Sequence, residues 1–243
     1  MNIHISSITL KGAREKNEDR ILLGEEIIKD GRKDLDIYIS ENGSYIIALA
    51  DGMGGHKAGD VAAEMLLELL RNEILNLPPD LSESELIEEI NKLAQNAHNY
   101  LLEESKKKPE LEKMGTTLIA VLFYNNLAYF FNAGDSRLYR FRDGYLARLS
   151  KDHSVKALTG LPSHALLNSF GAGKTVFIDL SKLKLFENDI LLLCSDGLTD
   201  TLTDDEIEKI LGLSQDPLKD LVTAAFERGS EDNISLIIIY IKN

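Results

Sequence analysis

The sequence predicts an α+β fold, a layered domain in which helices cover a core of antiparallel β-strands. Three observations support this prediction. Apolar runs of strand length follow one another with short turn sequences between them. Amphipathic segments of helix length come in two pairs, one after the first strands and one near the C-terminal end. The 243 residues contain no internal repeat and no low-complexity linker, so we expect a single domain over residues 1–243.

The predicted strands are short apolar runs bounded by turn-forming residues. They cover residues 3–10, 45–50, 117–124, 127–132, 138–141, 145–149, 175–180, 189–195 and 234–241. In the middle of the chain, Asn125-Asn126 and Asp143-Gly144 separate consecutive runs and are turn signals. We therefore expect the strands between residues 117 and 149 to form an antiparallel meander.

Four helices are predicted from apolar periodicity and from capping sequences. They cover residues 58–74, 82–105, 203–211 and 217–228. In the first pair, apolar residues recur every three or four positions, which places them on one face that packs against the core. Ser82 and Thr203 are each followed three residues later by a glutamate, the sequence of a capping box. Pro217 suits the first position of the last helix.

The composition limits the partners and the compartment. A formal net charge of −13 argues against nucleic acid, because duplex binding rests on Lys and Arg that neutralise phosphates. Solvated helix faces account for most of the acidic residues, so the charge alone decides little. The apolar runs are strand-sized, far short of the ~20 residues of a membrane helix, so no membrane partner is expected. The first residues do not resemble a signal peptide, and Cys194 is the only cysteine, which favours the cytoplasm.

Four aspartates lie at the ends of predicted strands. Asp51, Asp135 and Asp196 each follow an apolar run, and Asp232 precedes the last one. A hairpin turn explains Asp143-Gly144, because another strand follows it directly. The sequence after Asp51 and after Asp196 is helical or irregular, so these two are strand exits whose side chains can project into a cleft. A purely structural role for all four aspartates is the alternative.

Several carboxylates in one cleft predict bound cations. Two carboxylates at ~4 Å repel each other by ~1 kcal/mol in water and by more in a drier site, so protons or cations must relieve the repulsion. Hard oxygen ligands without a cysteine pair favour Mg²⁺ or Mn²⁺ over zinc. Two such ions ~3.5–4 Å apart can share a water molecule, lower its pKa and promote in-line displacement at phosphorus. The choice between Mg²⁺ and Mn²⁺ stays open.

Six short motifs occur in the order seen in one protein family. They are Gly12-Ala13-Arg14 through Asn17-Glu18-Asp19-Arg20, Ala50-Asp51-Gly52-Met53-Gly54-Gly55-His56, Gly115-Thr116-Thr117, Ala133-Gly134-Asp135-Ser136-Arg137, Cys194-Ser195-Asp196-Gly197-Leu198 and Glu231-Asp232-Asn233. Together they resemble the metal-dependent type 2C protein serine/threonine phosphatases. The motif with Met53 resembles that of the bacterial branch of this family. Each motif is weak alone, but six in register over nearly the whole chain are specific.

The resemblance implies a four-layer αββα sandwich, two antiparallel sheets flanked by helix pairs, with metals in a cleft at one end. By this likeness Asp51 bridges two ions, and the carbonyl of Gly52 binds one of them. Asp196 and Asp232 complete the protein ligands. The implied cofactors are two core Mg²⁺ or Mn²⁺ ions, with a third, weaker ion as an option.

The resemblance also assigns the groups around these ligands. Glu18 and Asp19 would hold metal-bound waters, and Asp135 would support the third ion together with Asp196. Arg14 would grip the substrate phosphate, because its planar guanidinium donates two parallel hydrogen bonds. The residues expected to act in catalysis are therefore Arg14, Asp51 and Asp196.

The implied function is hydrolysis of phosphoserine and phosphothreonine in proteins by a metal-activated water, in opposition to a bacterial serine/threonine kinase. Phosphoprotein substrates and a kinase are the expected partners, and the chain is expected to be a monomer. The alternative is a non-catalytic phosphoprotein-binding regulatory module with the same fold. It is motivated by residues 157–173, where relatives carry a longer flap. In those relatives the flap bears on substrate choice and on binding of the third ion. Met53 stands where animal members carry a histidine, so the general acid is not assigned.

Other motifs in the chain favour weaker interpretations. Residues 169–175 resemble the end of a P-loop, but a strand rather than a helix is predicted next. Ser136 lacks the histidine base of a serine esterase, since no histidine follows His164. Cys194 lacks the arginine of a cysteine phosphatase loop and is expected to be a small buried hydrophobe.

Four polar residues near the motifs have structural interpretations. Arg137 is expected to brace its strand through an ion pair rather than to contact a metal-site carboxylate. His153 is interpreted as structural, and His56 has no clear task. Asn233 either orients the Asp232 region or forms a simple turn.

Overall fold

Two antiparallel sheets packed face to face form the centre of the protein. The structure is a computed structural model and describes residues 1–54 and 58–242, in which each of these sheets has six strands. Sheet A consists of β1 (Asn2–Leu10), β4 (Gly31–Tyr38), β10 (Arg137–Arg142), β11 (Tyr145–Arg148), β13 (Ile190–Cys194) and β14 (Ile234–Lys242). Its strand order is β11-β10-β13-β14-β1-β4, and all neighbours are antiparallel.

Sheet B has the same number of strands and faces sheet A. It consists of β2 (Arg20–Leu23), β3 (Glu26–Ile28), β5 (Ser44–Ala50), β8 (Leu118–Tyr124), β9 (Leu127–Ala133) and β12 (Asp179–Leu183). Its order is β12-β9-β8-β5-β2-β3, again antiparallel throughout. A small ladder of β6 (Gly52–Met53) and β7 (Gly115–Thr116) extends beyond its end.

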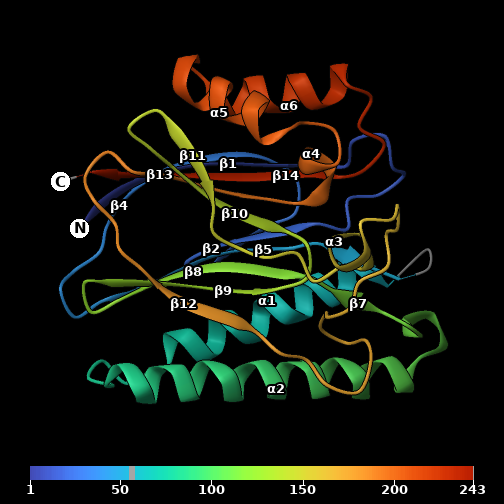
Figure 1. Cartoon of the computed structure of the whole chain (residues 1–243). Helices are drawn as coiled ribbons and strands as arrows, with labels where there is room; N and C mark the ends of the chain where they lie inside the picture. Colours follow the sequence, from blue (N-terminus) through green and yellow to red (C-terminus); the bar gives the residue numbers. More distant parts are fainter. Residues whose placement is uncertain (55–57, 243) are drawn as a thin grey trace.

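Helix pairs cover the two outer faces (Figure 1). The helices are α1 (Gly59–Leu75) and α2 (Glu83–Lys107) on sheet B, and α5 (Asp204–Leu213) and α6 (Pro217–Glu227) on sheet A. Shorter helices are α3 (Val155–Thr159), α4 (Asp196–Thr199) and the 3₁₀ turn Pro109–Leu111. The layers therefore follow the order helix, sheet, sheet, helix, and the predicted αββα sandwich is confirmed. No helix in the described part of the chain combines the length and the apolarity needed to cross a bilayer.

The apolar periods of the sequence correspond to three packed layers of side chains. Residues such as Leu49, Val121 and Ile239 lie between the two sheets and have no exposed surface. Strands such as β8 are buried on both faces, which explains why they read as continuous apolar runs rather than as alternating ones. The two remaining apolar clusters lie between each sheet and its helix pair.

The predicted helix starts are confirmed in atomic detail. The Ser82 hydroxyl accepts a hydrogen bond from the backbone N–H of Glu85, whose carboxylate accepts one from the N–H of Ser82. Thr203 and Glu206 form the same reciprocal pair at the start of α5. Each capping box satisfies backbone N–H groups that the first turn of a helix leaves without partners.

The strand predicted at residues 175–180 is displaced to Asp179–Leu183. Side chains bind the backbone of the preceding residues instead of a neighbouring strand. Asn168 accepts a hydrogen bond from the N–H of Phe177 and donates one to its carbonyl oxygen, and Gln95 donates to the carbonyl of Val176. Apolar composition alone could not distinguish this arrangement from a strand.

Three strands of the N-terminal region were not predicted. The strand β4 alternates exposed and half-buried residues along its length, because it is the edge strand of sheet A. The charged residues of this strand obscure the alternation of apolar and polar positions in the sequence. The strands β2 and β3 are too short to give a periodic signal.

Candidate active site

A cavity of about 270 Å³ at one end of the sandwich brings the predicted site residues together. Seven of the eight line it: Arg14, Glu18, Asp51, Gly52, Asp135, Asp196 and Asp232. The eighth, Asp19, is 1% exposed and interacts electrostatically with Asp196 and Asp232. Of the glycine motif around Met53, residues Gly55 and His56 lie outside the described part of the chain.

Antiparallel pairing explains why residues so distant in the sequence meet. The strands β5 and β9 both pair with β8, so they run in the same direction and end at one edge of sheet B. Asp51 follows the first of them and Asp135 the second. In sheet A the end of β13 lies beside the start of β14, which places Asp196 and Asp232 at a common edge. Each carboxylate is therefore carried at the end of a strand held in a sheet.

A cluster of hydroxyl groups fixes the backbone of Asp51. Its N–H donates a hydrogen bond of 3.1 Å to the Thr117 hydroxyl, and its carbonyl accepts 2.9 Å bonds from the Thr117 N–H and the Thr116 hydroxyl. The Thr117 and Ser136 hydroxyls lie 2.7 Å apart. The role of the Gly115-Thr116-Thr117 motif, not assigned from the sequence, is thus to hold the exit of β5.

Asn233 joins the two ends of the chain at the cavity. Its amide nitrogen donates hydrogen bonds of 2.8 and 2.7 Å to the carbonyls of Lys11 and Lys16, and its side-chain oxygen accepts one of 2.9 Å from the N–H of Glu18. These bonds bind the loop of Glu18 to the start of β14. Of the two interpretations of Asn233, the geometry favours positioning over a simple turn.

Arg14 lies at the rim of the cavity and contacts Asp232. Its Nη2 donates a hydrogen bond of 2.7 Å to Oδ2 of Asp232, and 58% of its side chain is exposed. An exposed guanidinium beside an acidic cavity can bind an anion that enters from solvent. Asp232 is drawn toward this cation in the structure.

Burial and mutual repulsion raise the pKa values of the carboxyl groups. Burial, with added repulsion from Asp196 and Asp232, raises the pKa of Asp19 to about 7. Burial and the neighbouring carboxylates also raise the pKa of Asp196 to about 7 and that of Asp51 well above its usual range. These groups are therefore costly to ionise without a nearby cation.

Asp135 and Glu18 show the same trend at the edge of the cluster. Burial, followed by repulsion from Asp152, raises the pKa of Asp135 to about 6. Burial and then the nearby Asp60 raise the pKa of Glu18. The whole cavity is thus an environment in which added positive charge is favourable.

The cavity fits divalent cations bound partly through water. Both carboxylate oxygens of Asp19 are buried without a hydrogen-bond partner in the structure, and an ion or its bound water would satisfy them. In the described ranges, no three His, Cys, Asp or Glu side chains are close enough to make a ready ligand set for one ion. The donor set is therefore open, and backbone carbonyl and water oxygens must complete it, as Mg²⁺ and Mn²⁺ allow.

The raised pKa values predict how pH affects the metal-free protein. Because Asp19 and Asp196 have pKa values near 7 when folded and an ordinary value of 3.8, the folded chain binds more protons than the unfolded chain between these values. Stability in EDTA should therefore fall as pH rises through this window. We expect the Tm at about pH 7.5 to be lower than at about pH 5 by at least ~2–4 °C, the shift that ~1 kcal/mol produces in a domain of this size.

The Asp19→Asn variant is the control for this prediction. The buried ring of His98 has a lowered pKa and acts in the opposite direction, so only the difference between wild type and variant isolates the carboxyl group. The variant should lose less stability over the same pH range, and Mn²⁺ should restore the wild type at the higher pH. Parallel pH profiles for the two proteins would contradict the prediction.

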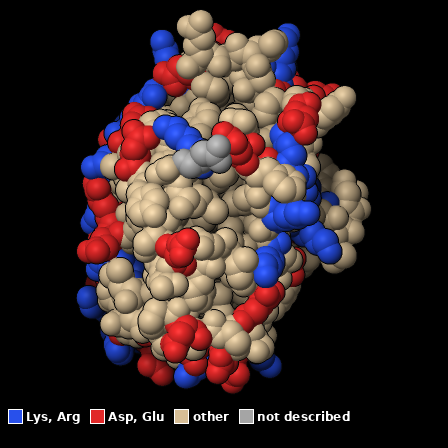
Figure 2. All heavy atoms as spheres, turned by 90° about the vertical axis from the view of Figure 1, so that its left-hand side faces the viewer, with Lys and Arg blue, Asp and Glu red and all other residues tan. Residues whose placement is uncertain are grey.

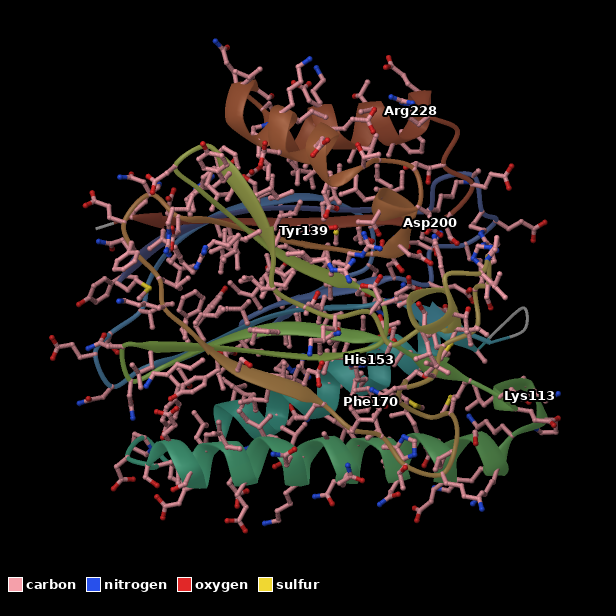
Figure 3. The ribbon with its side chains drawn as sticks, viewed as in Figure 1. Lys113, Tyr139, His153, Phe170, Asp200 and Arg228 are labelled. Atoms are coloured by element: carbon pink, nitrogen blue, oxygen red, sulfur yellow. The ribbon has the colours of Figure 1, made fainter. Side chains whose placement is uncertain are left out.

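Arg137 and His153 have the structural roles expected of them. Arg137 donates two hydrogen bonds to the carboxylate of Asp152, at 2.8 Å and 3.1 Å, so the predicted ion pair is confirmed. The Nδ1 of His153 accepts a bond from the N–H of Gly134, and the centroid of its ring lies 4.7 Å from that of Phe177 (Figure 3 labels His153). Cys194 is fully buried, as predicted.

The molecule has a larger groove, of about 770 Å³, away from the acidic cavity. It is lined by residues of β1, β4 and β14, and its main charges are already paired. Arg32 binds Asp34 and Asp216, and Lys242 binds Asp36. Figure 2 shows the end of the molecule that carries the termini, where acidic and basic side chains are both present. Paired charges of both signs give this groove no clear ligand preference.

Comparison with known proteins agrees with this geometry. A family model described as protein phosphatase 2C matches residues 29–235. The chain is 31% identical over 220 residues to the serine/threonine phosphatase stp of Listeria monocytogenes serotype 4b, with 84% of this chain and 87% of the relative covered. It is 31% identical over 210 residues to the serine/threonine protein phosphatase PstP of Mycobacterium tuberculosis, covering 81% of this chain and 40% of that longer protein.

Solved structures share the fold over nearly the full chain. The S. agalactiae serine/threonine phosphatase superposes with a TM-score of 0.83 at 28% identity, covering 99% of this chain and 100% of the other. The catalytic domain of PstP, solved in complex with two manganese ions, gives a TM-score of 0.78 at 25% identity, with both chains fully covered.

Together, the sandwich, its acidic cavity and these matches define a metal-dependent phosphatase. The chain belongs to the protein phosphatase 2C family. The resemblance inferred from the six motifs is confirmed, as are the enzymatic class and the dependence on Mg²⁺ or Mn²⁺.

Proposed function

We propose that this protein hydrolyses phosphoserine and phosphothreonine in other proteins and so opposes a serine/threonine kinase. The observation that carries the proposal is the cavity in which Asp51, Asp196 and Asp232 meet beside the exposed guanidinium of Arg14. The names of the bacterial relatives support the same substrate class. We propose further that the chain acts as one domain over residues 1–243, as a monomer, in the cytoplasm. Its single buried thiol is compatible with a reducing compartment.

The proposed metal ligands are the residues inferred from the sequence. Asp51, Asp196, Asp232 and the carbonyl of Gly52 would hold two core ions, and Asp135 would support a third beside Asp196. Bound ions would lower the pKa of a water molecule and neutralise charge on the phosphoryl group. The strand ends hold these oxygens in place before substrate arrives, which reduces the entropic cost of ordering the site.

Glu18 and Asp19 are proposed to act through water. Glu18 lines the cavity, and Asp19 lies behind it with both oxygens lacking partners. The hydrogen bond from the N–H of Glu18 to Asn233 keeps this loop against the start of β14. These features support the proposal that both carboxylates accept hydrogen bonds from water bound at the site.

A non-catalytic phosphoprotein-binding module is the alternative function. A binding module needs Arg14 but has no need of several carboxylates with raised pKa values, which repel a phosphate dianion unless cations are present. The relatives with matching sequence are named as phosphatases. The catalytic function is therefore the better supported of the two.

One assay tests the proposed function. Purified protein is incubated with p-nitrophenyl phosphate and with a phosphothreonine peptide, each with Mn²⁺ or with EDTA, and released product is measured. We expect turnover of both substrates with Mn²⁺ and none with EDTA. A folded sample that is inactive with Mn²⁺, or equally active in EDTA, would exclude the proposal.

Substitution of Arg14 should weaken phosphate binding more than it slows chemistry. A charge-assisted hydrogen bond is worth ~1.5–3 kcal/mol, so Arg14→Ala should raise KM for a phosphothreonine peptide by about 10-fold or more, with kcat changed by less than about threefold. The matched control is Arg32→Ala, which removes an arginine that binds Asp34 and Asp216 in the distant groove. An unchanged KM in the Arg14 variant would rule out its proposed role.

A further inference from the structure

Hydrolysis of a phosphate ester leaves an alkoxide that needs a proton, and few groups in the cavity can provide one. Among the described residues that line it, Met53 and Leu166 have no acidic proton, and Arg14 does not release one at accessible pH. Thr117 is engaged with Asp51 and Ser136. The carboxyl groups are needed in ionised form as proposed metal ligands.

Among the described residues that line the cavity, His164 carries a proton donor that no neighbouring group engages. Its imidazole lines the cavity and makes no hydrogen bond or ion pair to the part of the chain that the structure describes. Of all side chains with ordinary pKa values, the imidazole group changes its charge closest to neutral pH. This property suits it to general acid catalysis.

The backbone holds His164 over the cavity on a closed loop. The N–H of Val155 donates a 2.8 Å hydrogen bond to the carbonyl of Ala165, and the N–H of Leu167 donates one of the same length to the carbonyl of His153. The N–H of His153 in turn donates to the carbonyl of Gly134, directly before Asp135. The base of the loop is therefore fixed to the site, and His164 lies directly beside this base, exposed at the surface.

Two carboxylates in the hollow beside His164 have no basic partner within the described ranges. A small hollow joins His164 to Asp135, Arg137, Asp152, Lys156, Asp196 and Asp200. Within this hollow Lys156 binds Asp200 at 2.7 Å, and Arg137 binds Asp152 at 2.8 Å. Figure 3 shows Asp200 on the sheet A side of this end of the molecule. Asp135 and Asp196 have no basic partner in these pairs, so the hollow beside His164 is acidic.

We propose that His164 is a catalytic residue that protonates the leaving oxygen of the phosphorylated serine or threonine. A water oxygen forms a new bond to phosphorus, and the bond from phosphorus to the side-chain oxygen breaks with its electron pair moving to that oxygen. The oxygen takes a proton from His164, and the imidazole regains one from solvent. The products are inorganic phosphate and the free hydroxyl side chain. This inference rests on the proposed phosphatase function.

The experiment compares substrates that differ in their need for a proton. A nitrophenolate leaves without protonation, whereas the alkoxide of a phosphothreonine peptide does not. His164→Asn should therefore lower kcat for the peptide by about 10²–10⁴-fold, the usual contribution of a general acid, and change kcat for p-nitrophenyl phosphate by less than about threefold. Across a series of aryl phosphates, the dependence of log kcat on leaving-group pKa should become steeper.

Each alternative outcome has a distinct meaning. The His4→Asn variant, which alters an imidazole on β1 bound to Asp36, is the control and should match wild type on every substrate. Equal losses on the peptide and on p-nitrophenyl phosphate would overturn the proposal and indicate a role in positioning or metal binding. Unchanged kcat on both would overturn it as well. Wild-type protein that turns over neither substrate would instead refute the phosphatase function itself.

Discussion

Replacement of Asp196 by asparagine is expected to lower kcat by at least about 10³-fold without unfolding the protein. Loss of one charged ligand removes several kcal/mol of transition-state stabilisation that a bound ion supplies, and each 1.36 kcal/mol is tenfold in rate. The substitution keeps the size of the side chain and removes one of several mutually repelling buried carboxylates. The metal-free variant should therefore be at least as stable as wild type.

Two readouts separate a lost ligand from a lost fold. Steady-state kinetics with Mn²⁺ gives the loss of kcat, and thermal unfolding with and without Mn²⁺ gives the stabilisation by metal, which should shrink in the variant. The control is Asp205→Asn, which changes an exposed aspartate in the first turn of α5. Near-normal turnover by the Asp196 variant would exclude its role as a ligand.

Substitution of Gly197 by alanine should disable the site by displacing backbone. A Cβ at this position would lie 1.9 Å from the carbonyl oxygen of Asn233, and neither backbone can move aside freely. Relief of the overlap must separate α4, which begins at Asp196, from the start of β14, which follows Asp232. Overpacking of this kind costs ~1–3 kcal/mol. A displacement of ~1 Å in a catalytic group can lower the rate ~10²-fold.

The matched control is the helical Gly212. Alanine there would meet only the side chain of Phe141, at 3.2 Å, and lies away from the cavity. We expect Gly197→Ala to lower both the Tm and kcat with Mn²⁺, and Gly212→Ala to leave kcat unchanged. Wild-type kinetics in the Gly197 variant would show that the close approach of α4 and β14 is not needed for catalysis.

The sequence predicted the sandwich because its strongest signals are backbone signals. Central strands such as β8 are apolar along their whole length, and capping residues such as Ser82 mark where helices begin. The edge strand β4 was missed because its charged exposed face masks the alternation. The strand predicted at residues 175–180 begins later than expected. The side chain of Asn168, nine positions before Phe177, binds the backbone of Phe177 in place of a neighbouring strand, and no local sequence pattern indicates this contact.

The residues of the site were easier to predict than their interactions. Aspartates at strand exits are visible in a sequence, because the apolar run before each of them is visible. The orphaned oxygens of Asp19, by contrast, depend on which groups of other strands surround them. Likewise, nothing in the local sequence around Arg14 indicates that it binds Asp232, 218 positions away. Such contacts follow from the register of β1 with β14 rather than from composition.

The pairing of β1 with β14 affects when the site can form during synthesis on the ribosome. Arg14 leaves the exit tunnel long before Asp232 and β14, because 218 positions separate the two residues. A nascent chain can therefore form much of sheet B and its helices while the acidic cavity still lacks Asp232 and β14. Because Asp232 lines the cavity and lies just before β14, the cavity can form only after β14 has left the ribosome and paired with β1.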